Sequence, residues 1–331
     1  MSNEMNDIFL SVKNLTVEYV TREETVYAVN DVSFTLRKGK TLGLVGETGA
    51  GKTTIASSIL RVLPVPPAVV KSGEIILEGQ DLMKLSEDEM CKVRGKRITM
   101  IFQDPMTALN PVMTVGRQIS EVIALHDNVS KVEAKARAEQ MLEMVGIPAA
   151  RYNEYPDQFS GGMRQRVVIA IALACNPDLL LADEPTTALD VTIQAQVLDL
   201  IRELNSQKKT SMILITHDLG VVAEMCDDVA VVYAGEIIES GTIQDIFKNP
   251  THPYTLGLFG SIPRIDDDSE RLSPIAGLPP NPAKLPEGCK FHPRCPHATE
   301  ACKSGAVAMH EVSQGHFCRC IKIKEGEIDH G

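Results

Sequence analysis

The stretch Gly46–Thr53 reads G-E-T-G-A-G-K-T and combines the residue types that bind a chain of phosphates. It matches the pattern G-x-x-x-x-G-K-[ST] at every fixed position. Glycine lets the backbone adopt a positive φ close to an anion, so successive N–H groups can point at phosphate oxygens. Lys52 can neutralise the β- and γ-phosphates, and the Thr53 hydroxyl can ligate Mg²⁺. The predicted nucleotide-binding residues here are Gly46, Glu47, Thr48, Gly49, Ala50, Gly51, Lys52, Thr53 and Thr54.

Two carboxylates end the run Asp178–Glu184, which reads D-L-L-L-A-D-E and has the form of a buried parallel strand. Asp183 is predicted to hold Mg²⁺, and Glu184 to orient and deprotonate an attacking water. His217 follows another buried run, Ser211–Thr216, and is predicted to donate a hydrogen bond to a γ-phosphate. Acidic residues at strand ends are ordinary surface features in most proteins, but beside a phosphate loop they indicate hydrolysis.

Three weaker signals accompany these motifs. Tyr19, at the end of N-L-T-V-E-Y, could stack on an adenine or simply belong to the core. Gln103 stands in F-Q-D-P, directly after the strand expected over Ile98–Phe102. The run F-S-G-G-M-R-Q-R precedes an apolar helix, where free N–H groups form either a plain capping turn or a second anion site. The candidates in that run are Ser160, Gly161 and Gly162.

The elements that must position these residues are visible in the hydrophobic pattern. The apolar run Thr41–Val45 predicts a buried strand that enters the loop, and Thr54–Leu63 predicts a helix that leaves it. Bound phosphates would then lie at a helix N-terminus. Ser130 and Glu133 predict a capping box for a polar-faced helix, and Asp190 predicts the start of another. Strands for an antiparallel layer are expected as two short runs within Ile8–Tyr19, and over Val32–Leu36 and Gly73–Leu77.

The composition bounds the class of protein. The chain has 331 residues, of which 44% are hydrophobic and 23% charged, as in a globular protein with an ample core. A net charge of −11 argues against nucleic acid as a partner. No apolar run approaches the roughly 18 residues that span a bilayer, and the polar start M-S-N-E-M-N-D does not resemble a signal peptide. We therefore expect the chain to remain in the cytosol.

Five of the eight cysteines gather in the proline-rich segment that begins near Asn249. The other three are expected to be small core residues, since thiols stay reduced in the cytosol. The gathered cysteines begin as C-x₅-C-x₆-C and allow disulfides, a zinc site with His292 or His297, or an iron–sulfur cluster; the spacing alone does not select iron. The scattered cysteines are Cys91, Cys175 and Cys226, and the gathered ones are Cys289, Cys295, Cys302, Cys318 and Cys320.

The chain resembles the ATP-binding subunit of an ABC transporter because its motifs follow one another in the same order. These motifs are the phosphate loop, Gln103, S-G-G-M-R-Q, L-L-L-A-D-E, A-L-D and His217. The resemblance covers roughly Ile8–Pro250 and implies an α/β fold, the P-loop NTPase ABC cassette, with an antiparallel β subdomain and a helical subdomain. We expect the ATPase domain over residues 7–250, its helical part over about 104–170, and a Pro/Cys-rich extension over 251–331.

The same resemblance implies roles for the weaker signals. Tyr19 would stack on the adenine of ATP, Gln103 would join Mg²⁺ and couple to membrane subunits, and His217 would contact the γ-phosphate. Ser160, Gly161 and Gly162 would grip the ATP that is bound to a partner cassette.

A narrower resemblance rests on F-Q-D-P-M-T-A-L-N-P, S-G-G-M-R-Q-R-V, N-P-T-H-P-Y-T and the cysteine tail. These are similar to the oligopeptide/dipeptide/nickel importer subfamily, and to the first of its two different ATPases. The subfamily implies a [4Fe–4S] cluster in the tail, with Cys318 as a competitor for the fourth position. The implied ligands are Cys289, Cys295, Cys302 and Cys320.

The expected function is therefore ATP hydrolysis that drives import of short peptides. The implied partners are a homologous second ATPase, two transmembrane permeases and an extracytoplasmic binding protein, which would hold the chain peripherally at the cytoplasmic face of the membrane. Three alternatives remain: import of nickel or another solute, a soluble ABC ATPase outside transport, and a metal-sensing regulator.

Overall fold

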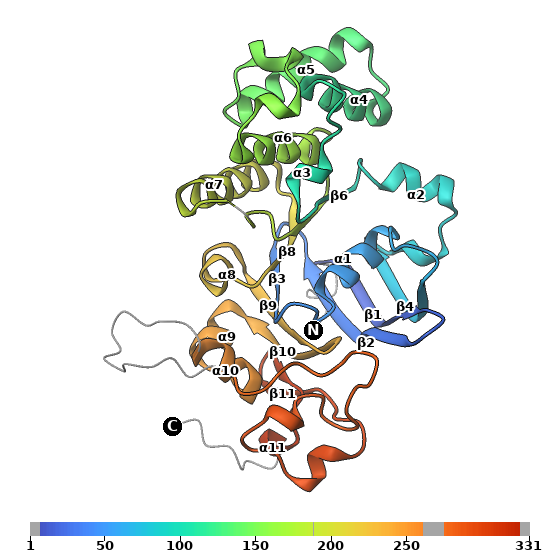
Figure 1. The fold of residues 1–331 in the computed structure, drawn as a ribbon, viewed down its shortest axis with the longest axis vertical. Coiled ribbons are helices and arrows are strands. Elements are labelled where there is room, and N and C mark those ends of the chain that lie inside the picture. Colours follow the sequence, from blue (N-terminus) through green and yellow to red (C-terminus); the bar gives the residue numbers. More distant parts are fainter. Residues whose placement is uncertain (1–6, 188, 261–274, 325–331) are drawn as a thin grey trace. The chain divides into compact units, whose positions relative to one another are not determined.

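The computed structural model of the protein describes residues 7–187, 189–260 and 275–324 (Figure 1). These residues belong to two compact units. One unit contains the chain up to Phe9, Leu36–Thr41 and Asp81–Thr216, and the other contains Leu10–Thr35, Leu42–Gln80 and the chain from His217 onward. Within the described residues, no helix combines the length and apolarity needed to cross a membrane.

The sheet strands of the first unit are short, apolar and fully buried. β7 pairs in parallel with β6 on one side, where Leu179 faces Ile98, and with β8 on the other, where Leu179 faces Ser211. Strands covered on both faces need no polar alternation, which is why they appear in the sequence as continuous apolar runs. The expected buried strands are confirmed as β6 (Ile98–Ile101), β7 (Leu179–Asp183) and β8 (Ser211–Thr216).

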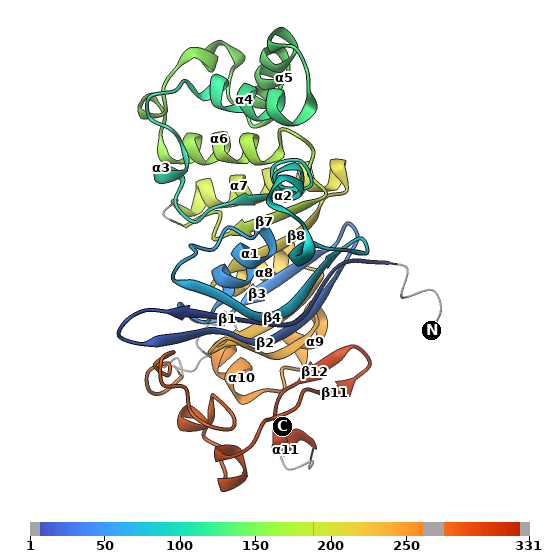
Figure 2. The ribbon, with the colours of Figure 1, turned by 90° about the vertical axis from the view of Figure 1, so that its right-hand side faces the viewer.

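The helices of the first unit include a group in which α4 and α5 lie side by side and both contact α6 (Figure 2). The buried residues Val115, Ile119 and Ile123 recur every four positions on α4 and form its inner face. The helices are η2 (Leu82–Lys84), α2 (Glu87–Val93), α3 (Pro105–Ala108), α4 (Val115–Asp127), α5 (Lys131–Met144), η3 (Ala149–Asn153), η4 (Pro156–Gln158), α6 (Gly161–Leu173) and α7 (Val191–Lys208).

The expected capping box of α5 is only half present. Ser130 Oγ accepts a hydrogen bond from the backbone N–H of Glu133 at 3.2 Å, as expected. The Glu133 carboxylate instead pairs with Arg137, one turn further along the same helix. An exposed carboxylate gains from a cation four residues later, and here that contact replaces the reciprocal cap.

The second unit contains a four-stranded sheet in the order β2-β1-β4-β5. β1 is one continuous strand, whereas the sequence indicates two short runs. The register of its antiparallel pairing with β4 shifts between Lys13 and Thr16, where Asn14 takes a φ of 50°. Asparagine tolerates this left-handed conformation, so a local irregularity joins the two runs. The strands are β1 (Ile8–Val20), β2 (Thr25–Arg37), β4 (Ala68–Leu77) and β5 (Gln80–Asp81).

A second group of strands in this unit follows the order β11-β12-β10-β9-β3. β3 and β9 are parallel, and the remaining pairs are antiparallel. The cysteine-rich tail supplies β11 and β12, which lie side by side (Figure 2). β12 pairs with β10, where Glu239 lies opposite Cys318. The strands are β3 (Thr41–Val45), β9 (Asp228–Tyr233), β10 (Glu236–Thr242), β11 (His310–Ser313) and β12 (His316–Cys318).

The helices of the second unit are short, and those of the tail are mostly single turns. The expected helix after the phosphate loop is confirmed, but it begins at Lys52 and ends at Leu60, where Arg61 adopts a left-handed φ of 53°. The helices are α1 (Lys52–Leu60), α8 (Leu219–Met225), α9 (Ile243–Lys248), α10 (Pro253–Gly260), η5 (His292–Arg294), η6 (Glu300–Lys303) and α11 (Ile321–Lys324).

Candidate functional site

The loop Gly46–Thr53 connects β3 to α1 in the second unit and depends on two glycines. Gly46 has a φ of 153°, and a Cβ there would lie 2.1 Å from the carbonyl oxygen of Val232. Gly51 has a φ of 103°, and a Cβ there would lie 2.3 Å from the carbonyl oxygen of Ala28. Both close approaches are to backbone atoms, which cannot rotate away, so only glycine fits either position.

Lys52 is buried, with 6% of its surface exposed, inside this loop. Its Nζ donates hydrogen bonds to the carbonyl oxygens of Gly46 at 2.7 Å and Glu47 at 3.0 Å. A buried ammonium needs such acceptors, and these carbonyls hold it against the loop. Thr53 lies exposed in the first turn of α1, where unpaired backbone N–H groups favour an anion.

Tyr19, on β1, reaches the first turn of the same helix with its side chain. Its hydroxyl is 3.3 Å from Thr54 Oγ1, and its side chain is half-buried. The structure therefore brings Tyr19 to the nucleotide loop, within the second unit, as an adenine-stacking residue requires.

The two predicted carboxylates end β7 in the first unit. Asp183 is buried, and Glu184 follows it with a left-handed φ of 46°. Glu184 Oε2 accepts hydrogen bonds from Gln103 Nε2 at 2.9 Å and Thr187 Oγ1 at 2.8 Å. A left-handed non-glycine residue carries strain and is often found at functional sites. The structure thus joins the predicted base to Gln103, and it adds Thr187, which the sequence analysis missed.

The Ser-Gly-Gly run begins α6, as expected. Ser160 caps the helix, and its Oγ accepts from the Met163 N–H at 3.4 Å. A Cβ on Gly161 would meet no atom within 4 Å, whereas one on Gly162 would lie 2.6 Å from Ile193 Cγ2 on α7. His217 directly follows β8 and is exposed.

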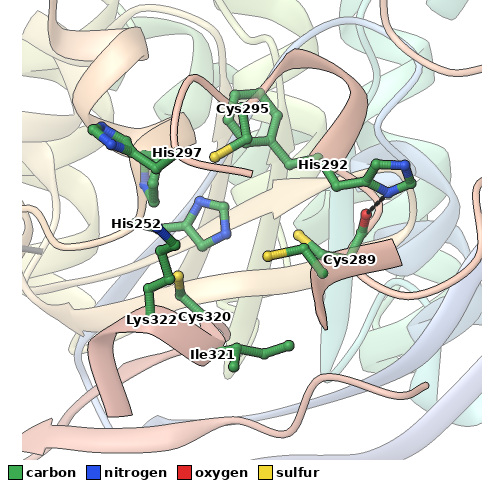
Figure 3. A pocket seen from close by; sticks show the side chains of 11 residues that line it. His252, Cys289, His292, Cys295, His297, Cys320, Ile321 and Lys322 are labelled. Carbon is green, nitrogen blue, oxygen red and sulfur yellow. Dashed lines mark hydrogen bonds between the residues drawn. The ribbon is translucent and has the colours of Figure 1, made fainter. Parts of the chain in front are cut away.

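Four of the five tail cysteines line one pocket, and Figure 3 shows the labelled sulfurs of three of them facing a common space. Cys318 is instead buried in β12, opposite Glu239. All eight cysteines are free, with no disulfide between them. One core expectation is wrong, because Cys91 lies on an exposed face of α2. The pocket cysteines are Cys289, Cys295, Cys302 and Cys320.

The pKa of the Cys289 thiol is raised to about 11, mainly by burial and in smaller part by the neighbouring thiols of Cys320, Cys295 and Cys302, because adjacent thiolates repel. Within the described part of the chain, no three His, Cys, Asp or Glu side chains are arranged to hold a single metal ion. His292 donates its Nδ1 hydrogen to the Cys289 carbonyl at 2.9 Å (Figure 3).

An ion pair that the sequence analysis missed links the tail to the nucleotide loop. The Arg294 guanidinium donates to both carboxylate oxygens of Glu47, at 2.7 and 3.0 Å. The sequence indicates this ion pair only through Glu47 itself, because an acidic residue inside a phosphate loop is expected to pair with a cation. Nothing in the sequence places that cation 247 residues away.

Two family models match the chain. "ABC transporter" matches residues 29–187, and "Oligopeptide/dipeptide transporter, C-terminal region" matches residues 238–302. The oligopeptide transport ATP-binding protein OppD of Bacillus subtilis is 52% identical over 94% of this chain and 87% of its own length. The chain is an ABC transporter ATP-binding protein of the oligopeptide/dipeptide transporter family.

Further relatives of this ABC protein support the same family assignment. The dipeptide transport ATP-binding protein DppD of Bacillus subtilis is 51% identical over 94% of this chain and 93% of its own. OppD of Escherichia coli is 48% identical over 98% and 96% of the two chains. Among solved structures, the ATP-binding cassette MJ0796, a dimer bound to ADP and Pi, has a TM-score of 0.64 and 29% identity over 71% of this chain and 98% of its own. The protein therefore has the ABC cassette fold and is an ABC-type ATPase.

Proposed function

We propose that the protein is the ATP-hydrolysing subunit of an ABC importer for short peptides. Its relatives are named as oligopeptide and dipeptide transport ATP-binding proteins, with matches over nearly the whole chain. The observation that carries the catalytic part is the 2.9 Å hydrogen bond between Gln103 and Glu184. It ties the proposed general base to the residue proposed to respond to the membrane subunits, so transport and hydrolysis can be coupled.

In this proposal, Lys52 and the loop N–H groups bind the phosphates of ATP, and Tyr19 stacks on the adenine. Thr53, Gln103 and Asp183 hold Mg²⁺, whose oxygen preference they meet. Glu184 takes a proton from the attacking water, and His217 donates a hydrogen bond to the γ-phosphate. Ser160, Gly161 and Gly162 contact the ATP of a partner cassette at the start of α6, where the helix dipole favours an anion.

The proposed assembly contains a distinct second ATPase, two permeases and an extracytoplasmic binding protein, with this chain at the cytoplasmic face of the membrane. The dimeric cassette among the similar structures supports a pair of cassettes. We further propose an ATPase domain over residues 7–250, with helical residues near 104–170, and an extension over 251–331. The family match that begins at residue 238 supports a distinct C-terminal region.

The catalytic assignment is tested with Glu184→Gln in the assembled transporter. The amide keeps the volume and most hydrogen bonds but cannot accept the proton, so ATP turnover should fall by about 10²–10⁴-fold while ATP still binds. Uptake of a radiolabelled tripeptide into proteoliposomes should fall with it. Turnover and uptake are measured on the same preparation, with [γ-³²P]ATP bound under non-turnover conditions as the binding assay.

The matched control is Glu203→Gln, which neutralises an exposed carboxylate on α7. It should leave both turnover and uptake unchanged. Near-normal turnover in the Glu184 variant would exclude this residue as the base. Uptake of Ni²⁺ without uptake of peptide by the unaltered transporter would contradict the proposed substrate class.

We also propose that the pocket cysteines Cys289, Cys295, Cys302 and Cys320 hold a [4Fe–4S] cluster. The proposal is supported by the four cysteines lining one pocket, since a [4Fe–4S] cluster is held by four cysteine thiolates. When bound, such a cluster would supply covalent cross-links between tail segments that have little apolar core of their own.

Protein purified without oxygen should contain iron and acid-labile sulfide in equal amounts and be brown. Cys302→Ser should abolish the colour and make the tail sensitive to protease, while Cys226→Ser, in a buried position outside the pocket, should do neither. Stoichiometric zinc without labile sulfide would show that the metal is misassigned. A metal-free tail that resists protease would contradict the cluster itself.

A further inference from the structure

Arg294 lies in the turn η5, between the pocket cysteines Cys289 and Cys295, and reaches the nucleotide loop of the same unit. Its Nη1 and Nη2 donate to the two oxygens of Glu47 at 2.7 and 3.0 Å. Its Nε donates to the Ala276 carbonyl at 3.0 Å, and only 5% of the side chain is exposed. A two-pronged contact made by a buried guanidinium fixes the orientation of the carboxylate as well as its charge.

The carboxylate, the backbone N–H and the carbonyl of Glu47 all form hydrogen bonds. Its carboxylate accepts from Arg294, its backbone N–H donates to Tyr254 Oη at 3.0 Å, and its carbonyl accepts from Lys52 Nζ at 3.0 Å. One residue therefore connects the tail arginine to the lysine of the phosphate loop. A shift of Glu47 would move a carbonyl that positions the Lys52 ammonium.

The surroundings of this contact are aromatic, buried and closely packed. Tyr233, Tyr254 and Phe291 pack on one another with ring centroids 4.6, 5.3 and 5.4 Å apart, and all three are buried. The Arg294 guanidinium also donates to Tyr233 Oη at 3.3 Å. β9, α10 and the tail each contribute one of these rings, so the tail packs against the base of the loop.

The charge of Glu47 explains why a cation is needed there. A carboxylate in a loop that binds a polyphosphate repels the ligand, and the repulsion is strong where water is excluded. The guanidinium cancels that charge without occupying the loop. It also keeps the carboxylate turned toward the tail.

We propose that Arg294 is a positioning residue for nucleotide binding. By neutralising and orienting Glu47, it sets the loop and Lys52 for phosphate, so the affinity for nucleotide depends on an ordered cysteine tail. This inference rests on the proposed assignment of Gly46–Thr53 as the nucleotide site.

The test is calorimetric titration of the full chain, purified without oxygen, with Mg²⁺-ADP. Arg294→Met removes the charge at similar length and should raise the Kd about 10-fold, since the partly exposed Glu47 carboxylate is left without its guanidinium partner beside the phosphate loop. Adding Glu47→Gln to that variant removes the unpaired carboxylate and should restore the Kd to within about 3-fold of the unaltered protein. Arg294→Lys keeps the charge but loses the two-pronged contact, so its Kd should lie between those of the unaltered protein and Arg294→Met.

The matched control is Arg319→Met. Arg319 also directly precedes a pocket cysteine, Cys320, but donates to the carbonyls of Ile237 and Val307 instead of the loop. Its replacement should loosen the tail, seen as a lower midpoint of thermal unfolding, and change the Kd less than about 2-fold. Iron content is measured for each variant, so that loss of metal is separated from loss of the contact.

Three outcomes would overturn the inference. They are an unchanged Kd in Arg294→Met, an equal rise in Arg319→Met, and a double variant that binds no better than Arg294→Met alone. Lys52→Ala separates this inference from the assignment of the site. If Lys52→Ala binds Mg²⁺-ADP normally, the loop is not the nucleotide site, and both proposals fall. If it abolishes binding while Arg294→Met is normal, only the role of Arg294 is wrong.

Discussion

Gly161 and Gly162 are neighbours in the chain but differ in what surrounds them. A methyl group on Gly161 would project into open space, and one on Gly162 would press on Ile193. Both are proposed to contact the ATP of a partner cassette, so this dipeptide must satisfy both the packing against α7 and the proposed contact with nucleotide. Substituting them singly separates the packing requirement from the functional one.

Gly161→Ala should leave the isolated chain as stable as before, or more stable by about 0.5–1 kcal/mol, because alanine favours a helix over glycine. The same change should lower ATPase activity of the assembled transporter, since the added methyl group stands where the partner's nucleotide is proposed to bind. Gly162→Ala should lower the free energy of unfolding by about 1–3 kcal/mol through its clash with Ile193. Urea unfolding and steady-state ATPase assays measure the two effects. Full activity in Gly161→Ala would argue against the proposed contact.

At the residue scale, the sequence predicted local chemistry but not distant partners. The glycines of the phosphate loop and the cap Ser160 follow from rules that span a few residues, and the structure has them as expected. The Gln103–Glu184 and Glu47–Arg294 contacts join residues 81 and 247 positions apart. Such contacts depend on how strands and turns are brought together, which no local spacing encodes.

Among the elements, the junction of β10 with β12 depends on one buried carboxylate. Glu239 accepts hydrogen bonds from His316 Nε2 at 2.8 Å and from the backbone N–H groups of Thr251 and His252 at 2.6 and 2.9 Å. Burial alone raises the pKa of this carboxyl, and the hydrogen bonds, led by the one from His316, outweigh burial and lower it. Cys318, on the paired strand, and His252 are further titratable groups that interact with this carboxylate.

Because the folded-state pKa of Glu239 is lowered, its ionised form stabilises the fold above the unfolded pKa of about 4.5, and this contribution is lost as pH falls through the lower folded value. Glu239→Gln should therefore cost about 3 kcal/mol near pH 7, as expected for breaking a buried hydrogen-bonded pair. The cost should shrink below pH 4.5, where the natural carboxyl also becomes neutral. Urea unfolding at several pH values measures the difference.

Glu236, on the same strand, provides a control of opposite sign. Burial raises its pKa, although Arg319 and Lys290 partly oppose the rise. Its folded state therefore holds a proton more tightly than its unfolded state, and Glu236→Gln should become more favourable as pH rises through the raised pKa. If both variants respond to pH in the same direction, the hydrogen bonds to Glu239 do not set the pH dependence.

Prediction of the elements succeeded where the pattern was strong. β3, β7 and β8 are continuous apolar runs, and α7 begins after Asp190 as the cap indicates. The tail hairpin was not foreseen, because β11 and β12 are only four and three residues long and have little apolar alternation. Their place is set by pairing with β10, a tertiary effect that outweighs weak local propensity.

For the whole molecule, the proposed pairing of cassettes predicts how activity depends on concentration. If each ATP needs the loop of one chain and Ser160–Gly162 of another, an isolated chain holds only half of each site. The specific activity of the purified subunit should then rise with its concentration, and rise further when the second ATPase and the permeases are added. A specific activity that stays high and constant down to nanomolar protein would contradict this arrangement. Phosphate release across a dilution series measures it.

The hairpin β11–β12 also changes which strand forms the boundary of its sheet. β10 pairs on one side with β9 and on the other with β12, so the outermost position passes to the four-residue β11. Short terminal strands recruit other chains poorly, whereas a longer strand with unpaired N–H and C=O groups is a template for aggregation. A protein cut after Pro250 would expose the edge of β10, including the apolar pair Ile237 and Ile238. The tail hairpin therefore occupies an edge of β10 that would otherwise be open to pairing with another chain.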